Sequence, residues 1–162
     1  MKKSEFNEML RRATPVASYM RECSAECRPK YDARRASYIP RLDILDALKP
    51  YTKGYIVVAI GADWCKDCVS NLPVLDLIHE ATGLPVYVLG GVKTDPLNPN
   101  RQWAVPPSPP EVDILNIKAI PTILLYTPAG QEIGRIIENP SLKPTLEEEL
   151  LCILETQLPS NR

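Results

Sequence analysis

The chain has 162 residues and a formal net charge of −1 at pH 7, and 44% of its residues are hydrophobic. This length fits one domain, and the composition is ordinary for a soluble globular protein. The near-zero net charge gives no general attraction to nucleic acid or to membranes, and no apolar run approaches the ~18 residues of a membrane span. The first 12 residues lack the apolar core of a secretory signal, so we expect a cytoplasmic protein.

The first 40 residues are predicted to form a helical extension packed on or near the body. Residues 4–27 have the spacing of an amphipathic helix that Pro15 interrupts. Residues 28–40 are polar and are interpreted as a connector. Residues 42–48 then predict a short helix that ends before Pro50. The domain proper is therefore expected to span residues 41–162.

Residues 55–60 form a β-branched apolar run, which predicts a buried strand. A turn follows, and from Cys65 onward apolar residues recur at helical spacing until Gly83 ends the helix. The sequence thus places a Cys-x-x-Cys pair, Cys65 and Cys68, at the start of a helix.

Further elements are expected along the rest of the chain. Residues 84–89, 122–126 and 132–137 predict strands, and residues 112–118 predict a short helix. Thr145 and Glu148 resemble a capping box that opens a last helix. Its core stripe comprises Leu146, Leu150, Ile153, Leu154 and Leu158.

Residues 95–110 contain six of the 17 prolines, which predicts a surface loop rather than a helix or central strand. Trp103 is its one large apolar side chain. It either anchors the loop to the body or forms a docking surface for a partner beside the active site.

A thiol in the first turn of a helix has a definite chemistry. The unpaired N–H groups there stabilise a thiolate, so the pKa of Cys65 is expected to be lowered and Cys65 to be a nucleophile. Cys68, one turn further on, can attack a mixed disulfide formed on Cys65. The pair therefore predicts dithiol redox chemistry.

Two motifs together resemble the thioredoxin superfamily: Trp64-Cys-Lys-Asp-Cys68 after a buried strand, and Ile120-Pro121-Thr122 before another. The resemblance covers roughly residues 40–158. It implies a three-layer α/β/α sandwich with a mixed sheet, and a cis Pro121 opposite the cysteines. It also implies that Trp64 shields the site and that Ile120 and Pro121 hold the substrate backbone.

The sequence departs from thioredoxins at two places. Ala59 stands where thioredoxins usually carry a buried Asp that relays a proton, and Asp63 and Asp67, the nearest carboxylates in sequence, are expected to face solvent. Lys66 and Asp67 replace the usual Gly-Pro between the cysteines. Lys66 favours the Cys65 thiolate and Asp67 opposes it, so their net effect on the pKa is expected to be small.

Other interpretations of the cysteines stay open. Cys23, Cys27, Cys65 and Cys68 are a candidate set for zinc or an iron–sulfur cluster, and a redox-inert adaptor is a further alternative. Cys23 and Cys27 lie four residues apart on one expected helix face, either as plain thiols or as a second redox pair. The lone His79 is 14 residues from Cys65, too far along one helix to form a Cys-His pair.

The favoured function is cytoplasmic thiol–disulfide exchange, with protein disulfides as the substrates that are reduced. An odd count of five cysteines fits one catalytic pair in a reducing compartment better than a structural disulfide framework. No bound cofactor is required, because a reductase or a small thiol would supply the electrons.

Overall fold

The central strand of the sheet is β2 (Ile56–Ile60), whose side chains are almost all buried. In the computed structural model, which describes residues 1–157, β2 pairs in parallel with β3 (Val86–Leu89) and antiparallel with β4 (Thr122–Tyr126). β5 (Glu132–Ile137) extends the sheet beyond β4, and β1 (Thr14–Pro15) extends it beyond β3. The result is the predicted mixed sheet, with the strand order β1-β3-β2-β4-β5.

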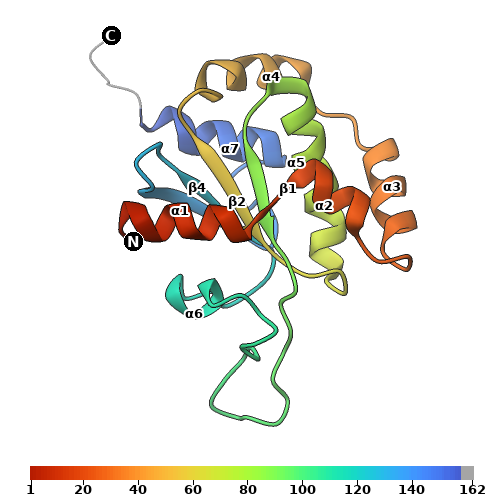
Figure 1. The fold of residues 1–162 in the computed structure, drawn as a ribbon. Coiled ribbons are helices and arrows are strands. Elements are labelled where there is room, and N and C mark those ends of the chain that lie inside the picture. The colour runs from red at the N-terminus through yellow and green to blue at the C-terminus, as the bar shows by residue number, and fades with distance from the viewer. Residues whose placement is uncertain (158–162) are drawn as a thin grey trace.

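Helices cover both faces of this sheet (Figure 1). One face carries α5 (Lys66–Thr82) and α7 (Leu146–Glu155), against which α4 (Leu42–Leu48) packs, followed by a 3₁₀ turn at Lys49–Tyr51. The other face carries α1 (Lys3–Arg12), where the ring of Phe6 lies 4.9 Å from that of Tyr126 in β4. The predicted α/β/α architecture is therefore confirmed.

The N-terminal segment differs from the prediction of one interrupted helix over residues 4–27. Pro15 does not merely break a helix, because it lies in the edge strand β1 opposite Tyr87, a position where a missing N–H is tolerated. The helix α2 (Val16–Glu22) starts only after it. The chain then turns before the next helix.

The polar connector predicted for residues 28–40 was also wrong, because Arg28–Ser37 forms the helix α3. Two partly buried arginines of α3 contact α5, whereas Arg28, Lys30 and Asp32 are exposed. Arg34 Nε donates to the Ser70 carbonyl at 2.9 Å, and Arg35 Nε pairs with Asp76 at 2.8 Å. Tyr31 supplies the buried side chain of α3.

The division of the chain at residue 40 stays a prediction. Residues before it contribute β1 to the sheet, and Phe6 and Met9 belong to the same hydrophobic core as the strands. The N-terminal 40 residues thus share the core of residues 41–157.

The segment 95–110 is the loop that its prolines predict, and it extends below the sheet in Figure 1. Trp103 is buried, and its backbone forms an isolated antiparallel β-bridge with Thr94. Its Nε1–H donates to the Ile117 carbonyl at 2.8 Å. It therefore anchors the loop to the body. The helix after the loop, α6 (Glu111–Ile114), is one turn long and shorter than the predicted 112–118.

The predicted helix ends at Gly83 and Thr145 are confirmed. Gly83 terminates α5 with a φ of 83°, a left-handed value that suits glycine. Thr145 Oγ1 accepts the Glu148 N–H at 3.2 Å at the start of α7, while the Glu148 carboxylate pairs with Arg41. Leu158 of the predicted stripe lies outside the described residues.

Within residues 1–157, no helix combines the length and the apolar character that crossing a bilayer requires.

Candidate active site

Cys65 and Cys68 lie together at the N-terminus of α5. Cys65 is the residue that caps this helix, and its Sγ accepts the Cys68 N–H at 3.1 Å. Cys65 is 5% exposed and Cys68 is fully buried at 0%. One sulfur thus lies at the rim of the site, and the other lies beneath it.

The surroundings set the two thiols apart. The pKa of Cys65 is lowered, first by a hydrogen bond from the Cys68 side chain, with help from the Cys68 backbone N–H. The same hydrogen bond raises the pKa of Cys68, and burial raises it further. The direction for Cys65 is the one expected at a helix N-terminus, although the sulfur–sulfur contact contributes most. Cys65 is the better nucleophile, and Cys68 keeps its proton.

Gly61 makes room for the buried sulfur. A Cβ at Gly61 would lie 2.8 Å from Cys68 Sγ, closer than a real contact allows. The sulfur therefore packs directly over the end of β2. Ala59, one pleat earlier on the same face of the strand, is fully buried and carries no acid.

The second predicted motif lies against the first. The Ile120–Pro121 bond is cis, as predicted, and Cys65 Sγ donates to the Ile120 carbonyl at 3.4 Å. The fold therefore brings together two segments that are 55 residues apart in sequence. Ile120 is buried, and β4 begins directly after Pro121.

The residues around the cysteines differ in exposure. Trp64 is 59% exposed and is held by a hydrogen bond from its Nε1–H to the Val92 carbonyl at 2.8 Å. Lys66 is exposed and Asp67 is half-buried. The charge of Asp67 raises the pKa of both thiols and so opposes thiolate formation, as predicted for Cys65.

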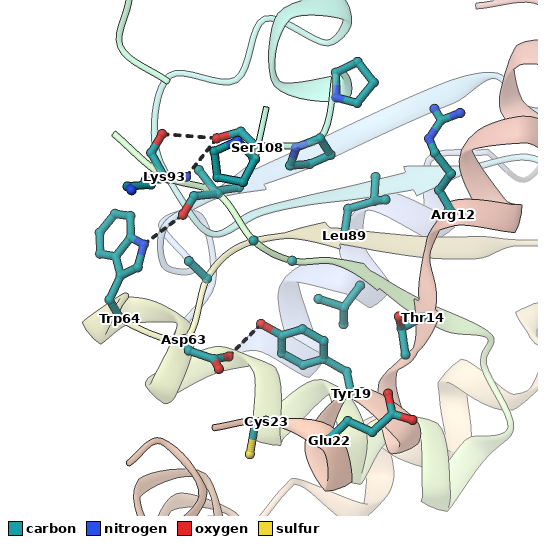
Figure 2. Close-up of a pocket in the computed structure, with 18 residues that line it drawn as sticks. Arg12, Thr14, Tyr19, Glu22, Cys23, Asp63, Trp64, Leu89, Lys93 and Ser108 are labelled. Carbon is teal, nitrogen blue, oxygen red and sulfur yellow. Dashed lines mark hydrogen bonds between the residues drawn. The ribbon is translucent and has the colours of Figure 1, made fainter. Parts of the chain in front are cut away.

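A cleft of about 900 Å³ opens beside Trp64 (Figure 2). Its walls are the α1–α2 segment and the prolines 107, 109 and 110, and its floor includes Gly90 and Gly91 at the end of β3. The sequence did not predict this cleft, because its walls come from four separate parts of the chain.

The prediction that Asp63 faces solvent was wrong. Asp63 is half-buried, and its carboxylate accepts the Tyr19 hydroxyl at 3.0 Å and the Ser24 N–H at 3.1 Å. Figure 2 shows Tyr19 and Asp63 pointing toward one another on the wall of the cleft. No local pattern could reveal this pair, because its members are 44 residues apart.

The prediction that Cys23 and Cys27 lie on one helix face was wrong. Cys23 follows the last residue of α2, and Cys27 precedes the first residue of α3. Both are free thiols, and burial raises the pKa of each.

The metal interpretation gains no support from this arrangement. Within residues 1–157, no group of three or more His, Cys, Asp or Glu side chains is placed to hold a metal ion. His79 instead forms a hydrogen bond between its Nδ1 and the Leu84 carbonyl, at 2.8 Å.

Known proteins resemble this chain in sequence over part of its length and in fold. A family model described as thioredoxin matches residues 13–89, a range that includes both cysteines. Over these residues the chain is similar to thioredoxin. A comparison with curated protein sequences gave no match.

Solved structures resemble this chain in fold at low sequence identity. A protein of unknown function from Pseudomonas aeruginosa is 17% identical with a TM-score of 0.69, covering 98% of this chain and 99% of its own. An HIV epitope scaffold is 17% identical with a TM-score of 0.70, covering 98% and 100%. Thioredoxin f2 from Chlamydomonas reinhardtii is 19% identical with a TM-score of 0.42, covering 71% and 94%. The likeness to the first two, which extends over almost the whole chain, concerns the fold alone.

Proposed function

We propose that this protein is a thiol–disulfide oxidoreductase that reduces protein disulfides. The observation that carries the proposal is the asymmetric dithiol at the start of α5. Cys65 lies at the rim with a lowered pKa, and Cys68 lies buried 3.1 Å away, measured from its backbone nitrogen to Cys65 Sγ. Such a pair divides the work between a nucleophile and a resolving thiol.

The reaction has two exchange steps. The Cys65 thiolate attacks one sulfur of the substrate disulfide, and the other substrate sulfur leaves as a thiolate. Cys68 then loses its proton and attacks Cys65 Sγ, which releases the second substrate thiolate. The substrate gains two electrons, and a Cys65–Cys68 disulfide remains. A reductase or a small thiol returns the protein to the dithiol.

Binding of a polypeptide substrate is supported by the backbone beside the cysteines. The Ile120 N–H takes part in no hydrogen bond among residues 1–157, so it is free to pair with a substrate chain. The cleft beside Trp64 gives room for the chain that flanks the substrate disulfide. This direction of reaction suits the reducing cytoplasm that the odd cysteine count favours.

Reduction of insulin by a thiol reductant, followed as turbidity, tests the proposal. The wild type should accelerate precipitation, and Cys65→Ser should abolish the acceleration. Cys68→Ser should instead accumulate a disulfide-linked adduct on Cys65, seen as an added mass that a reductant removes.

Cys152→Ser is the matched control, because Cys152 is a partly exposed thiol in α7 away from the site. It should leave the rate unchanged. A wild-type rate no higher than that of Cys65→Ser would refute the proposed function.

A further inference from the structure

Cys68 is buried, and the dithiol itself contains no group that accepts the Cys68 proton. Its sulfur is inaccessible and its pKa is raised, so a nearby group has to accept its proton before it can attack Cys65. Ala59, on the same face of β2, offers no acceptor.

The register of the sheet places the Tyr19 hydroxyl near Cys68. Ile60 pairs with Leu89, so the next residues, Gly61 and Gly90, lie side by side on neighbouring parallel strands and face the same side. A Cβ at Gly61 would lie 2.8 Å from Cys68 Sγ, and one at Gly90 would lie 3.0 Å from Tyr19 Oη. The sulfur and the hydroxyl thus lie over neighbouring positions at the ends of β2 and β3, strands whose backbones are about 4.8 Å apart.

The Tyr19 hydroxyl leads on to a carboxylate. It donates to Asp63 Oδ1 at 3.0 Å, and the Ser24 N–H holds Asp63 Oδ2 at 3.1 Å, so the carboxylate is fixed in place. Both residues line the cleft beside Trp64 (Figure 2). Burial is the largest cause that raises the pKa of Tyr19, and electrostatic interactions with Asp63 and, as the smallest contribution, with Cys68 raise it further.

We propose that the Tyr19–Asp63 pair accepts the proton of Cys68 when Cys68 attacks the mixed disulfide on Cys65. The proton passes by way of the Tyr19 hydroxyl to the Asp63 carboxylate. The Cys68 sulfur bonds to Cys65 Sγ, the bond between Cys65 and the substrate breaks, and the substrate sulfur leaves with the electron pair as a thiolate. Asp63 later releases the proton to water in the cleft. The inference rests on the proposed function of the dithiol.

Several other charged and titratable groups surround the pair. They are Arg12, Glu22, Cys23 and Lys93 around the cleft, Cys27 and Tyr31 of α3, and Lys66, Asp67 and Cys68 of α5. Asp63→Asn and Tyr19→Phe leave all of these in place. Tyr19→Phe also keeps the ring that packs over Gly90.

The experiment follows the release of the coloured thiolate from dithionitrobenzoate in the full-length chain. Cys23 and Cys152 are replaced by Ser so that they do not react. Attack by Cys65 releases the first equivalent, and attack by Cys68 on the resulting mixed disulfide releases the second. Cys68→Ser identifies the second phase by abolishing it. Both rates are measured between about pH 6 and pH 9.5, around the ordinary pKa of a thiol.

Asp63→Asn and Tyr19→Phe should each slow the second phase about 100-fold near neutral pH, as loss of a general base does. The first phase should keep its rate and pH profile, because Cys68 and the α5 backbone set the pKa of Cys65. The second phase should recover at high pH, where hydroxide removes the proton. Combining the two changes should add little, because both break the same path.

Asp67→Asn is the matched control, because it removes a carboxylate that raises the pKa of both thiols. It should shift both phases to lower pH. If Asp63 acted only as a nearby charge, Asp63→Asn would speed the second phase, and that result would overturn the inference. Equal slowing of both phases would show a merely structural role and would also overturn it.

The same assay separates this inference from the proposed function. A wild type without a second phase would refute the dithiol mechanism and the inference together. A normal second phase with no effect of either substitution would overturn the inference alone.

Discussion

At the scale of single residues, the side chain at position 68 affects the pKa of Cys65. The largest cause of the lowered pKa of Cys65 is its hydrogen bond from the Cys68 side chain. Cys68→Ala removes this donor but keeps the backbone N–H, whereas Cys68→Ser keeps a hydroxyl donor at the same place. The identity of residue 68 should therefore control the titration of Cys65.

We expect Cys68→Ala to raise the pKa of Cys65 toward that of an ordinary thiol and Cys68→Ser to raise it less. The rate of alkylation by iodoacetamide as a function of pH, with the adduct on Cys65 counted by mass, measures this. Because only the thiolate reacts, the rise in rate should move to higher pH. Identical profiles for the two variants would show that the helix N-terminus alone sets the pKa.

Gly61 controls the packing of the resolving sulfur. Gly61→Ala places a methyl group 2.8 Å from Cys68 Sγ, and we expect it to lower the free energy of unfolding by about 1–3 kcal/mol, as overpacking does. It should also slow the release of the second dithionitrobenzoate equivalent. Gly54→Ala is the control, because its Cβ would meet only Pro128 at an ordinary 3.6 Å. Equal urea midpoints and rates for the two variants would contradict the packing argument.

At the scale of elements, the regular strands and the dithiol helix could be predicted because their signals are local. The apolar run of β2, the spacing of α5 and the glycine that ends α5 all lie within a few residues of the structure they specify. The helix α3 was missed because the contacts that hold it come from far along the chain. Arg34 binds Ser70 and Arg35 binds Asp76, which lie 36 and 41 residues away. Without these contacts in view, the charged segment was interpreted as a connector.

The segment before α7 depends on one buried carboxylate. Glu149 is 2% exposed, and its Oε1 accepts the N–H groups of Ser141, Leu142 and Lys143 at 2.7–3.1 Å. Glu149→Leu should lower the free energy of unfolding by about 3 kcal/mol, because three backbone N–H groups lose a charged acceptor. Urea unfolding measures the loss.

Glu155→Leu, at an exposed position in the last turn of the same helix, should change the stability by less than about 0.5 kcal/mol. Similar losses for the Glu149 and Glu155 variants would show that the carboxylate does not hold this segment.

At the scale of the whole molecule, the N-terminal helix belongs to the core. Phe6 is fully buried between Gly130 and the ring of Tyr126, on the face of the sheet opposite α5. Phe6→Ala should lower the free energy of unfolding by about 3–5 kcal/mol, in one transition with the rest of the chain. Ile39→Ala, at a site 87% exposed, should cost less than about 0.5 kcal/mol. A separate early transition in the Phe6 variant would show that residues 1–40 fold as their own unit.

The site as a whole could be predicted only in part. Cys65, Cys68, Ile120 and Pro121 were predicted because two short motifs carry them. Tyr19 and Asp63 meet across 44 residues, and the cleft beside them is lined partly by the distant prolines 107, 109 and 110 of the loop. Side chains that depend on such long-range packing leave no periodic signal in the sequence.

The central claim is that Cys65 and Cys68 form a reversible redox pair. Equilibration of the full chain in glutathione buffers between about −320 and −120 mV, followed by alkylation and peptide mass mapping, tests it directly. We predict one two-electron transition in which Cys65 and Cys68 become disulfide-linked to each other while buried Cys27 stays a free thiol. Cys65 and Cys68 that remain thiols over the whole range would contradict the account.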